Sequence, residues 1–290
     1  MELVASLKHK VWGWPAAANF ALGGMAAGCY LLTVVMGCDT EDVPNMLQSE
    51  WKVLPPVVVG LCFLGMAFEA GRPLRSKYVL NNLRSSWMSR EILAGGMFVL
   101  TAVLDWFFPH VVFRTLAVTG ALGLIMSQGF ILYRARAVTS WNVRLVPIHF
   151  VTSSLSTGFG LVLLLAVRNT VILDGHSLMI GLICLLLNLA IWLTYLRGYC
   201  DAPFRNATEV LRHPSSLFLT VGIGHLIPGL LVGLLFLGWS IDIGVGLQQT
   251  MFVPAGLAIV AGGVAQKFTI VCRTNYLRGI TIEEPISTSV

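Results

Sequence analysis

The sequence predicts an all-α polytopic membrane protein, for three reasons. Hydrophobic residues make up 56% of the 290 residues and charged residues 11%, and the mean hydropathy of +0.79 lies far above the range of soluble domains. Eight apolar windows are long enough to cross a hydrocarbon core of ~30 Å as helices. A chain inside lipid must also satisfy its backbone polar groups internally, which helices do.

Eight transmembrane helices are expected in order along the chain, at residues 15–37, 53–71, 88–108, 113–134, 145–167, 177–198, 216–238 and 251–272. The first window continues past Gly37 without a small-residue cleavage pattern, so we expect a retained span and not a signal peptide. Close helix packing is expected along this span, because it is rich in small residues: Gly23, Gly24, Ala26, Ala27 and Gly28. A phosphate-binding loop is disfavoured there, since no strand precedes the glycines.

Basic residues gather in alternate connections, which predicts the orientation. Fifteen lysines and arginines precede the first window or follow the second, fourth, sixth and eighth windows, and three lie on the opposite side, at Lys52, Arg114 and Arg168. Short cytoplasmic loops collect such residues. We therefore expect a multi-pass protein of the inner (cytoplasmic) membrane with both termini in the cytoplasm, the N-terminal segment at 1–14 and the tail at 273–290. The net charge of +5 is then explained by the basic residues on the cytoplasmic side. No basic stretch interleaves aromatic residues as a nucleic-acid-binding surface would.

The six cysteines are widely scattered and form no C-x-x-C pair. Zinc sites and iron–sulfur clusters usually need such closely spaced ligands. The sequence therefore predicts no metal site and no iron–sulfur cluster in this chain, and any electrons must come from another chain.

The histidines argue against a b-type haem, which needs paired axial ligands at comparable depth. His149 lies about four residues into the fifth window and His225 about ten into the seventh, a depth difference of roughly 8 Å at 1.5 Å per residue. His225 is interpreted as a polar group satisfied inside the bundle, with a role in proton transfer. Asp105 and Lys267 are expected to snorkel from span edges toward water.

A charged stretch at residues 68–92, FEAGRPLRSKYVLNNLRSSWMSREI, separates the second window from the third. Glu69 and Glu91 lie at its two edges with Arg75 between them, while Asn19 lies one turn into the first window and Tyr133 ends the fourth. Arginine, asparagine and tyrosine can donate hydrogen bonds to the carbonyls of a quinone headgroup. A glutamate can relay the protons that accompany quinone reduction. The pattern predicts a site for menaquinone or ubiquinone at Arg75, Glu91, Glu69, Asn19 and Tyr133, with proton transfer through Glu91, Glu69 and His225.

The same residues also have structural interpretations. A carboxylate in the first turn of a helix is favoured by the helix dipole, so Glu91 is also suited to that role, with Ser89 as the N-cap. Tyr133 is suited to anchoring at the membrane interface, and Asn19 to helix–helix packing.

Four stretches resemble the membrane-anchor subunits of molybdopterin oxidoreductases, the family that includes the dimethyl sulfoxide reductase and polysulfide reductase anchors. They are WGWPAAANFALGGMAAG at 12–28, FEAGRPLRS at 68–76, SWMSREILAG at 86–95 and YRARAVTSWNVRLVPIHFVTSSLSTG at 133–158. Their order and spacing carry the resemblance over the first five helices, and the count of eight helices fits the whole chain.

The resemblance implies two packed four-helix bundles without haem, at 15–134 with the quinone site and at 135–272. It also implies a partner, a ferredoxin-like subunit with four iron–sulfur clusters, which contacts a catalytic subunit holding a molybdenum or tungsten bis-pterin cofactor. Arg75 and Glu91 match family positions that handle quinone, and Asn19 and Tyr133 correspond to polar residues of the first and fourth helices. Glu69 departs from the dimethyl sulfoxide reductase pattern, which has histidine two residues before the glycine.

The resemblance and the charge bias together predict a quinone-reactive subunit of a cytoplasm-facing complex, not itself catalytic for the organic substrate. That substrate is expected to be a cytosolic metabolite, such as phenylacetyl-CoA, another acyl-CoA thioester or formate. Two alternatives stay open: a secondary transporter coupled to protons through Glu69, Glu91 and His225, and a passive anchor without a quinone site.

Overall fold

The computed structural model describes residues 2–4, 12–37, 45–69, 73–168, 173–198, 201–239, 245–274 and 280–281, with side chains over 12–37, 50–67, 78–168, 173–198, 201–238 and 246–274. Within these residues, eight helical stretches are long and apolar enough to cross a membrane: Trp14–Val35, Glu50–Ala67, Trp87–Phe107, Val111–Arg134, Leu145–Arg168, Gly175–Arg197, Pro214–Gly238 and Gly246–Arg273. The eight predicted spans are thus confirmed to within a few residues, and with them the all-α polytopic fold class.

Five spans are single α-helices, and three contain π-helical turns. The single helices are α3 (Asn45–Glu69), α4 (Trp87–Phe107), α5 (Val111–Arg134), α6 (Leu145–Arg168) and α7 (Gly175–Arg197). The first span consists of α1 (Trp14–Ala18), η1 (Asn19–Gly23) and α2 (Gly24–Val35). The seventh consists of α10 (Pro214–Leu217), η3 (Phe218–Leu226) and α11 (Ile227–Trp239), and the eighth of α12 (Val245–Phe268) and η4 (Thr269–Arg273).

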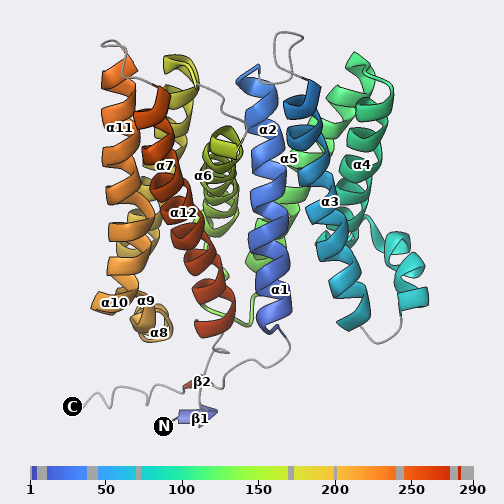
Figure 1. Ribbon diagram of the computed structural model, residues 1–290. Helices are drawn as coiled ribbons and strands as arrows, with labels where there is room; N and C mark the ends of the chain where they lie inside the picture. Colours follow the sequence, from blue (N-terminus) through green and yellow to red (C-terminus); the bar gives the residue numbers. More distant parts are fainter. Residues whose placement is uncertain are drawn as a thin grey trace, which may run out of the picture.

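Short elements lie at the ends of the spans. They are η2 (Pro73–Asn82), α8 (Ala202–Ala207), α9 (Glu209–Arg212), β1 (Glu2–Val4) and β2 (Ile280–Thr281). Strands β1 and β2 pair antiparallel, with Glu2 opposite Thr281. Strands β1 and β2 therefore meet on one face of the bundle, the face that also carries η2 and α8–α10 (Figure 1). This arrangement agrees with an even number of spans.

Side-chain caps start several of the helices. Ser86 Oγ accepts a hydrogen bond from Ser89 N at 3.3 Å at the start of α4, and Asp174 Oδ1 accepts one from Ser177 N at 2.9 Å at the start of α7. Each cap satisfies one of the backbone donors that a helix leaves unpaired at its N-terminus. The prediction of Ser89 as the N-cap of α4 is wrong: Ser89 lies inside the helix, and its hydroxyl donates to Val79 O at 2.6 Å.

The helices pack as two neighbouring sets of four spans. In the amino-terminal half, α2 and α4 each pack on both α3 and α5. In the carboxyl-terminal half, α6 and α11 each pack on both α7 and α12. The halves meet where α6 packs against α2 and α5. Helix α6 therefore joins the two halves, together with the eighth span, which packs against η1 and α1.

Glycines bring the backbones of α2 and α6 into direct contact. A Cβ atom at Gly28 would collide with the carbonyl group of Ser154, and one at Gly158 would collide with the backbone of Gly28 and Cys29. Between helices in lipid, van der Waals packing supplies much of the attraction, and small residues allow the closest approach. The expected close packing along the first span is confirmed, since Ala26 and Ala27 are also completely buried.

Candidate functional site

Glu91 is a buried carboxylate at the centre of a small polar cluster. Its side-chain oxygen Oε1 accepts hydrogen bonds from Asn19 Nδ2 at 3.1 Å and from Gln128 Nε2 at 3.4 Å. All three side chains are buried, and they come from three different spans. We call Asn19, Glu91 and Gln128 the Glu91 cluster. Glu91 is the fifth residue of α4, beyond the first turn, so the helix-dipole interpretation does not account for it.

The local fold explains how Asn19 reaches Glu91. The π-helical segment η1 begins at Asn19, where the first span changes from α1 to η1. Such π-turns shift side chains around the helix axis and are frequent at functional sites. Here the amide faces into the bundle and is only 4% exposed.

An apolar groove lies beside Asn19, between the first span and α3. Its volume is about 590 Å³, and its walls include Trp14, Leu22, Leu61 and Cys62 along with Asn19. Trp14 and Leu61 are exposed at the outside of the bundle, which in a membrane is the side that meets lipid. The groove therefore extends from the outside of the bundle to Asn19.

The structure brings two of the five predicted quinone-site residues together, Asn19 and Glu91. Tyr133 is half-buried at the end of α5, and its ring packs edge-on against Phe130 with centroids 6.3 Å apart, outside the Glu91 cluster. Glu69 ends α3 and Arg75 lies in η2, but their side chains fall outside the described residues.

His225 lies in the carboxyl-terminal half, away from the Glu91 cluster. Its Nδ1 is 2.6 Å from Thr220 O and its Nε2 is 3.0 Å from Asn188 Nδ2. Asn188 also donates to Gln266 Oε1 at 3.2 Å. The expectation of a polar group satisfied inside the bundle is therefore confirmed, whereas a proton-transfer role for His225 stays a prediction.

His149 lies on α6 and is completely buried. Its ring stacks on Trp192 with centroids 5.1 Å apart. Across the part of the chain that the structure describes, no group of three or more His, Cys, Asp or Glu side chains converges as a metal site would.

Lys267 was missed as a site residue, and the expectation that it snorkels to water is wrong. Its side chain is completely buried. Nζ donates to Phe20 O at 3.0 Å and to Ser154 Oγ at 2.8 Å, and lies 5.5 Å from the centroid of the Phe150 ring. Hydropathy alone could not reveal this burial, because it depends on which face of the eighth span meets the first.

Asp105 is also buried, at the other end of α4. Its Oδ2 lies 3.8 Å from Lys52 Nζ and 3.8 Å from Arg114 Nε, and its Oδ1 accepts a hydrogen bond from His110 N at 3.2 Å. The expectation of snorkelling is wrong here too, because the carboxylate pairs with cations inside the protein.

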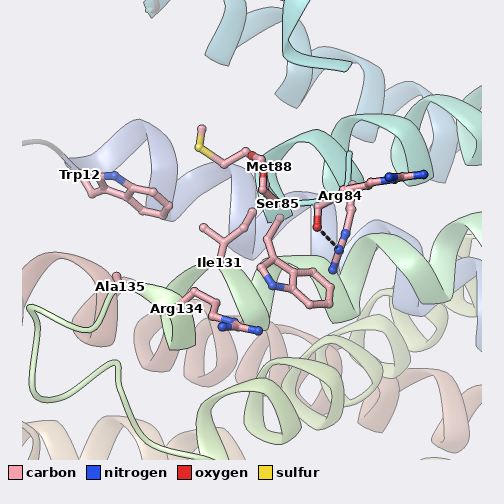
Figure 2. A pocket seen from close by; sticks show the side chains of 10 residues that line it. Trp12, Arg84, Ser85, Met88, Ile131, Arg134 and Ala135 are labelled. Atoms are coloured by element: carbon pink, nitrogen blue, oxygen red, sulfur yellow. Dashed lines mark hydrogen bonds between the residues drawn. The ribbon is translucent and has the colours of Figure 1, made fainter. Parts of the chain in front are cut away.

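A second, basic pocket of about 470 Å³ opens at the start of α4 and the end of α5, lined by Trp12, Trp87 and three arginines, Arg84, Arg90 and Arg134 (Figure 2). We call it the arginine pocket. Arg90 is fixed there by bonds from Nε to Leu83 O at 2.9 Å and from Nη2 to Arg84 O at 2.8 Å, and its guanidinium lies 4.3 Å from the Trp87 ring centroid. None of the residues lining this pocket is acidic.

Fold and site together define a polytopic helical membrane protein with a buried carboxylate–amide cluster behind a lipid-facing groove. The family model for the DMSO reductase anchor subunit (DmsC) matches residues 9–200, more than half of the chain. The chain therefore belongs to this family, which confirms the resemblance to anchor subunits of molybdopterin oxidoreductases. The matched residues include the groove and the Glu91 cluster but end before Lys267. A search of curated proteins found no match.

Proposed function

We propose that this chain is the quinone-reactive membrane anchor of a molybdenum or tungsten bis-pterin oxidoreductase, and that it exchanges electrons between membrane quinone and an iron–sulfur subunit. The observation that carries the proposal is the apolar groove that leads from lipid to Asn19, with Glu91 hydrogen-bonded behind it. The family supports the assignment to an anchor subunit.

The groove suits a quinone because its walls and its polar end differ in chemistry. The isoprenoid tail would lie against apolar walls such as Leu22 and Leu61, where burial of apolar surface is favourable. The headgroup would reach Asn19, whose amide can donate a hydrogen bond to a quinone carbonyl. Arg75 and Glu69 are the other proposed contacts of the headgroup, whereas Tyr133 does not line the groove.

Glu91 is the proposed proton-exchanging group. Reduction of a quinone takes up two protons with two electrons, and oxidation of a quinol releases them. Asn19 donates a hydrogen bond to Glu91, so a headgroup held at Asn19 would lie close to the carboxylate that exchanges protons with it. Glu69, and more remotely His225, would connect this carboxylate to water.

The arginine pocket is the proposed docking point of the iron–sulfur subunit, a ferredoxin-like protein with four clusters. The pocket lies at the η2 end of α4, on the face where the charge bias predicts cytoplasm. A half-buried arginine such as Arg90, fixed by its bonds to Leu83 O and Arg84 O, favours a carboxylate of a partner protein. The complex would then act on a cytosolic substrate, such as an acyl-CoA thioester or formate.

Quinone turnover by the reconstituted complex tests this proposal. Glu91→Gln should lower turnover by about 10²-fold or more, the usual loss when a general acid–base group is removed. Glu50→Gln is the matched control, because Glu50 lies at the other end of the bundle and pairs with Arg168. Turnover that is equal in both variants would support a passive anchor, and a chain that purifies alone and moves a solute would support a transporter.

A reporter fused after Val290 tests the orientation. Activity of a reporter that works only in the cytoplasm is the expected result. Activity of a reporter that works only outside it would place the arginine pocket and its partner on the opposite face.

A further inference from the structure

Gly24 makes room for three polar groups from three other helices. A Cβ atom at Gly24 would lie 2.5 Å from Lys267 Nζ, 2.5 Å from Ser154 Oγ and 3.1 Å from Gln128 Oε1. These atoms come from the eighth, fifth and fourth spans. The bare glycine backbone is what lets an ammonium group and an amide oxygen approach the same point in the middle of the protein.

The Gln128 side-chain amide lies between Glu91 and Lys267, with its nitrogen toward Glu91 and its oxygen toward the side of Lys267. Its Nε2 donates to Glu91 Oε1, and its Oε1 faces the region of Lys267. Oε1 is completely buried and accepts no hydrogen bond from any described residue. Buried acceptors are almost always satisfied, by protein or by ordered water. Lys267 Nζ makes two hydrogen bonds and has three donors, so it can supply the missing one.

Glu91 and Lys267 are both ionisable side chains buried within the protein. Among the described residues, no carboxylate lies within ion-pair distance of Lys267, and no cation lies within that distance of Glu91. A single charge buried within a membrane protein is costly unless a group of opposite sign is near. Gln128 lies between the two groups: its Nε2 donates to Glu91, and its Oε1 approaches the point beside Gly24 that Lys267 Nζ also approaches.

We propose that Lys267 is the countercharge of Glu91, connected to it through the Gln128 amide and a water molecule held between Lys267 Nζ and Gln128 Oε1 beside Gly24. Lys267 is then a positioning residue, since it acts on Glu91 from the eighth span and does not touch the groove. Its effect on quinone turnover rests on the proposed function, whereas the coupling of the two charges does not.

A double-mutant cycle on the intact complex tests the coupling. Glu91→Gln and Lys267→Met each remove one charge and leave the other buried alone, so each should lower the midpoint of thermal unfolding by several degrees. The double variant should lose much less than the sum of the two losses. Glu91→Gln combined with Asp105→Asn is the control, and there the losses should add. Additive losses for Glu91 and Lys267 would overturn the inference.

Infrared spectroscopy provides a test that needs no quinone. Lys267→Met should produce the C=O absorption of a protonated carboxyl group, and the further change Glu91→Gln should abolish it. Gly24→Ala should produce the same absorption, because its methyl group displaces Nζ, whereas Gly233→Ala, where the space is open, should not. Identical carboxyl spectra for the unsubstituted protein and Lys267→Met would overturn the inference.

Quinone turnover distinguishes failure of the coupling between Lys267 and Glu91 from failure of the proposed quinone reaction. If both hold, Lys267→Met slows quinone turnover in the unsubstituted protein and has no further effect in the Glu91→Gln background. If Glu91→Gln leaves turnover unchanged, the proposed function fails, while the thermal and infrared results still decide the coupling.

Discussion

Asn19 and Glu91, 72 residues apart in the chain, are joined by a hydrogen bond of 3.1 Å from Nδ2 to Oε1. This bond connects the wall of the groove with the acid behind it. Any molecule that binds Asn19 therefore changes the surroundings of Glu91 without having to enter the core, and the two residues should respond to substitution together.

Replacement of the Asn19 amide should weaken quinone binding. Asn19→Leu removes a donor from the groove and from Glu91, so we expect the quinone KM to rise at least about tenfold, the equivalent of one lost hydrogen bond to a charged or buried partner. Steady-state kinetics with a soluble quinone analogue measure the change. Gln248→Leu is the control, because it removes a buried amide near the start of α12 that does not line the groove, and it should leave the KM unchanged.

Filling the groove should block quinone directly. Gly65 lines the groove and has open space around it, so Gly65→Leu places a side chain in the groove without a clash. Gly60, on the same helix, also has open space but does not line the groove. We expect Gly65→Leu to abolish binding of a quinone analogue in a fluorescence-quenching titration and Gly60→Leu to retain it. Equal binding by both variants would place the quinone elsewhere.

The buried ion pairs at the other end of α4 should matter for stability and not for turnover. Asp105→Ala removes the described carboxylate partner of Lys52, whose side chain is only 11% exposed, so a loss of about 3 kcal/mol in the free energy of unfolding is expected. Glu50→Gln breaks a pair whose arginine is 73% exposed and should cost less than ~1 kcal/mol. Denaturant unfolding in detergent measures both. A turnover defect in Asp105→Ala at permissive temperature would contradict the assignment.

The contact between α2 and α6 at Gly28 should not accommodate a larger side chain. Gly28→Val drives a branched side chain into the Ser154 carbonyl, and since backbone cannot swing aside, we expect a loss near the upper end of the ~1–3 kcal/mol for overpacking, or more. Gly233→Val meets open space and is the control. Thermal unfolding of purified protein compares the two. Similar midpoints would mean that the helices can separate at little cost.

The spans could be predicted from the sequence because hydropathy is a local property. Each span is identified from its own residues, whatever helices it packs against. Asn19 and Glu91 were also predicted as site residues, since polar groups inside apolar windows are conspicuous. Their bond to each other was not predictable, because it requires the packing of three spans and the π-turn that begins at Asn19. The burial of Lys267 follows from the same packing: near the end of an apolar window, sequence alone favours exposure of a lysine.

Gln128 could have been predicted as a buried polar residue from the sequence. It lies within GLIMSQGF, in the interior of the fourth apolar window, where an amide is costly unless it finds a partner. A search for every polar side chain deep inside a window would have included it. Which partners it takes still depends on Gly24 and on the approach of the eighth span.

The close approach of Gly28 to Gly158 has a consequence for biosynthesis. A ribosome delivers α2 to the bilayer long before α6, so a nascent chain that has completed only its first four spans presents a glycine-lined strip to lipid with nothing to cover it. Chains truncated before residue 145 should therefore leave this strip uncovered, whereas chains that extend through Arg168 can cover it.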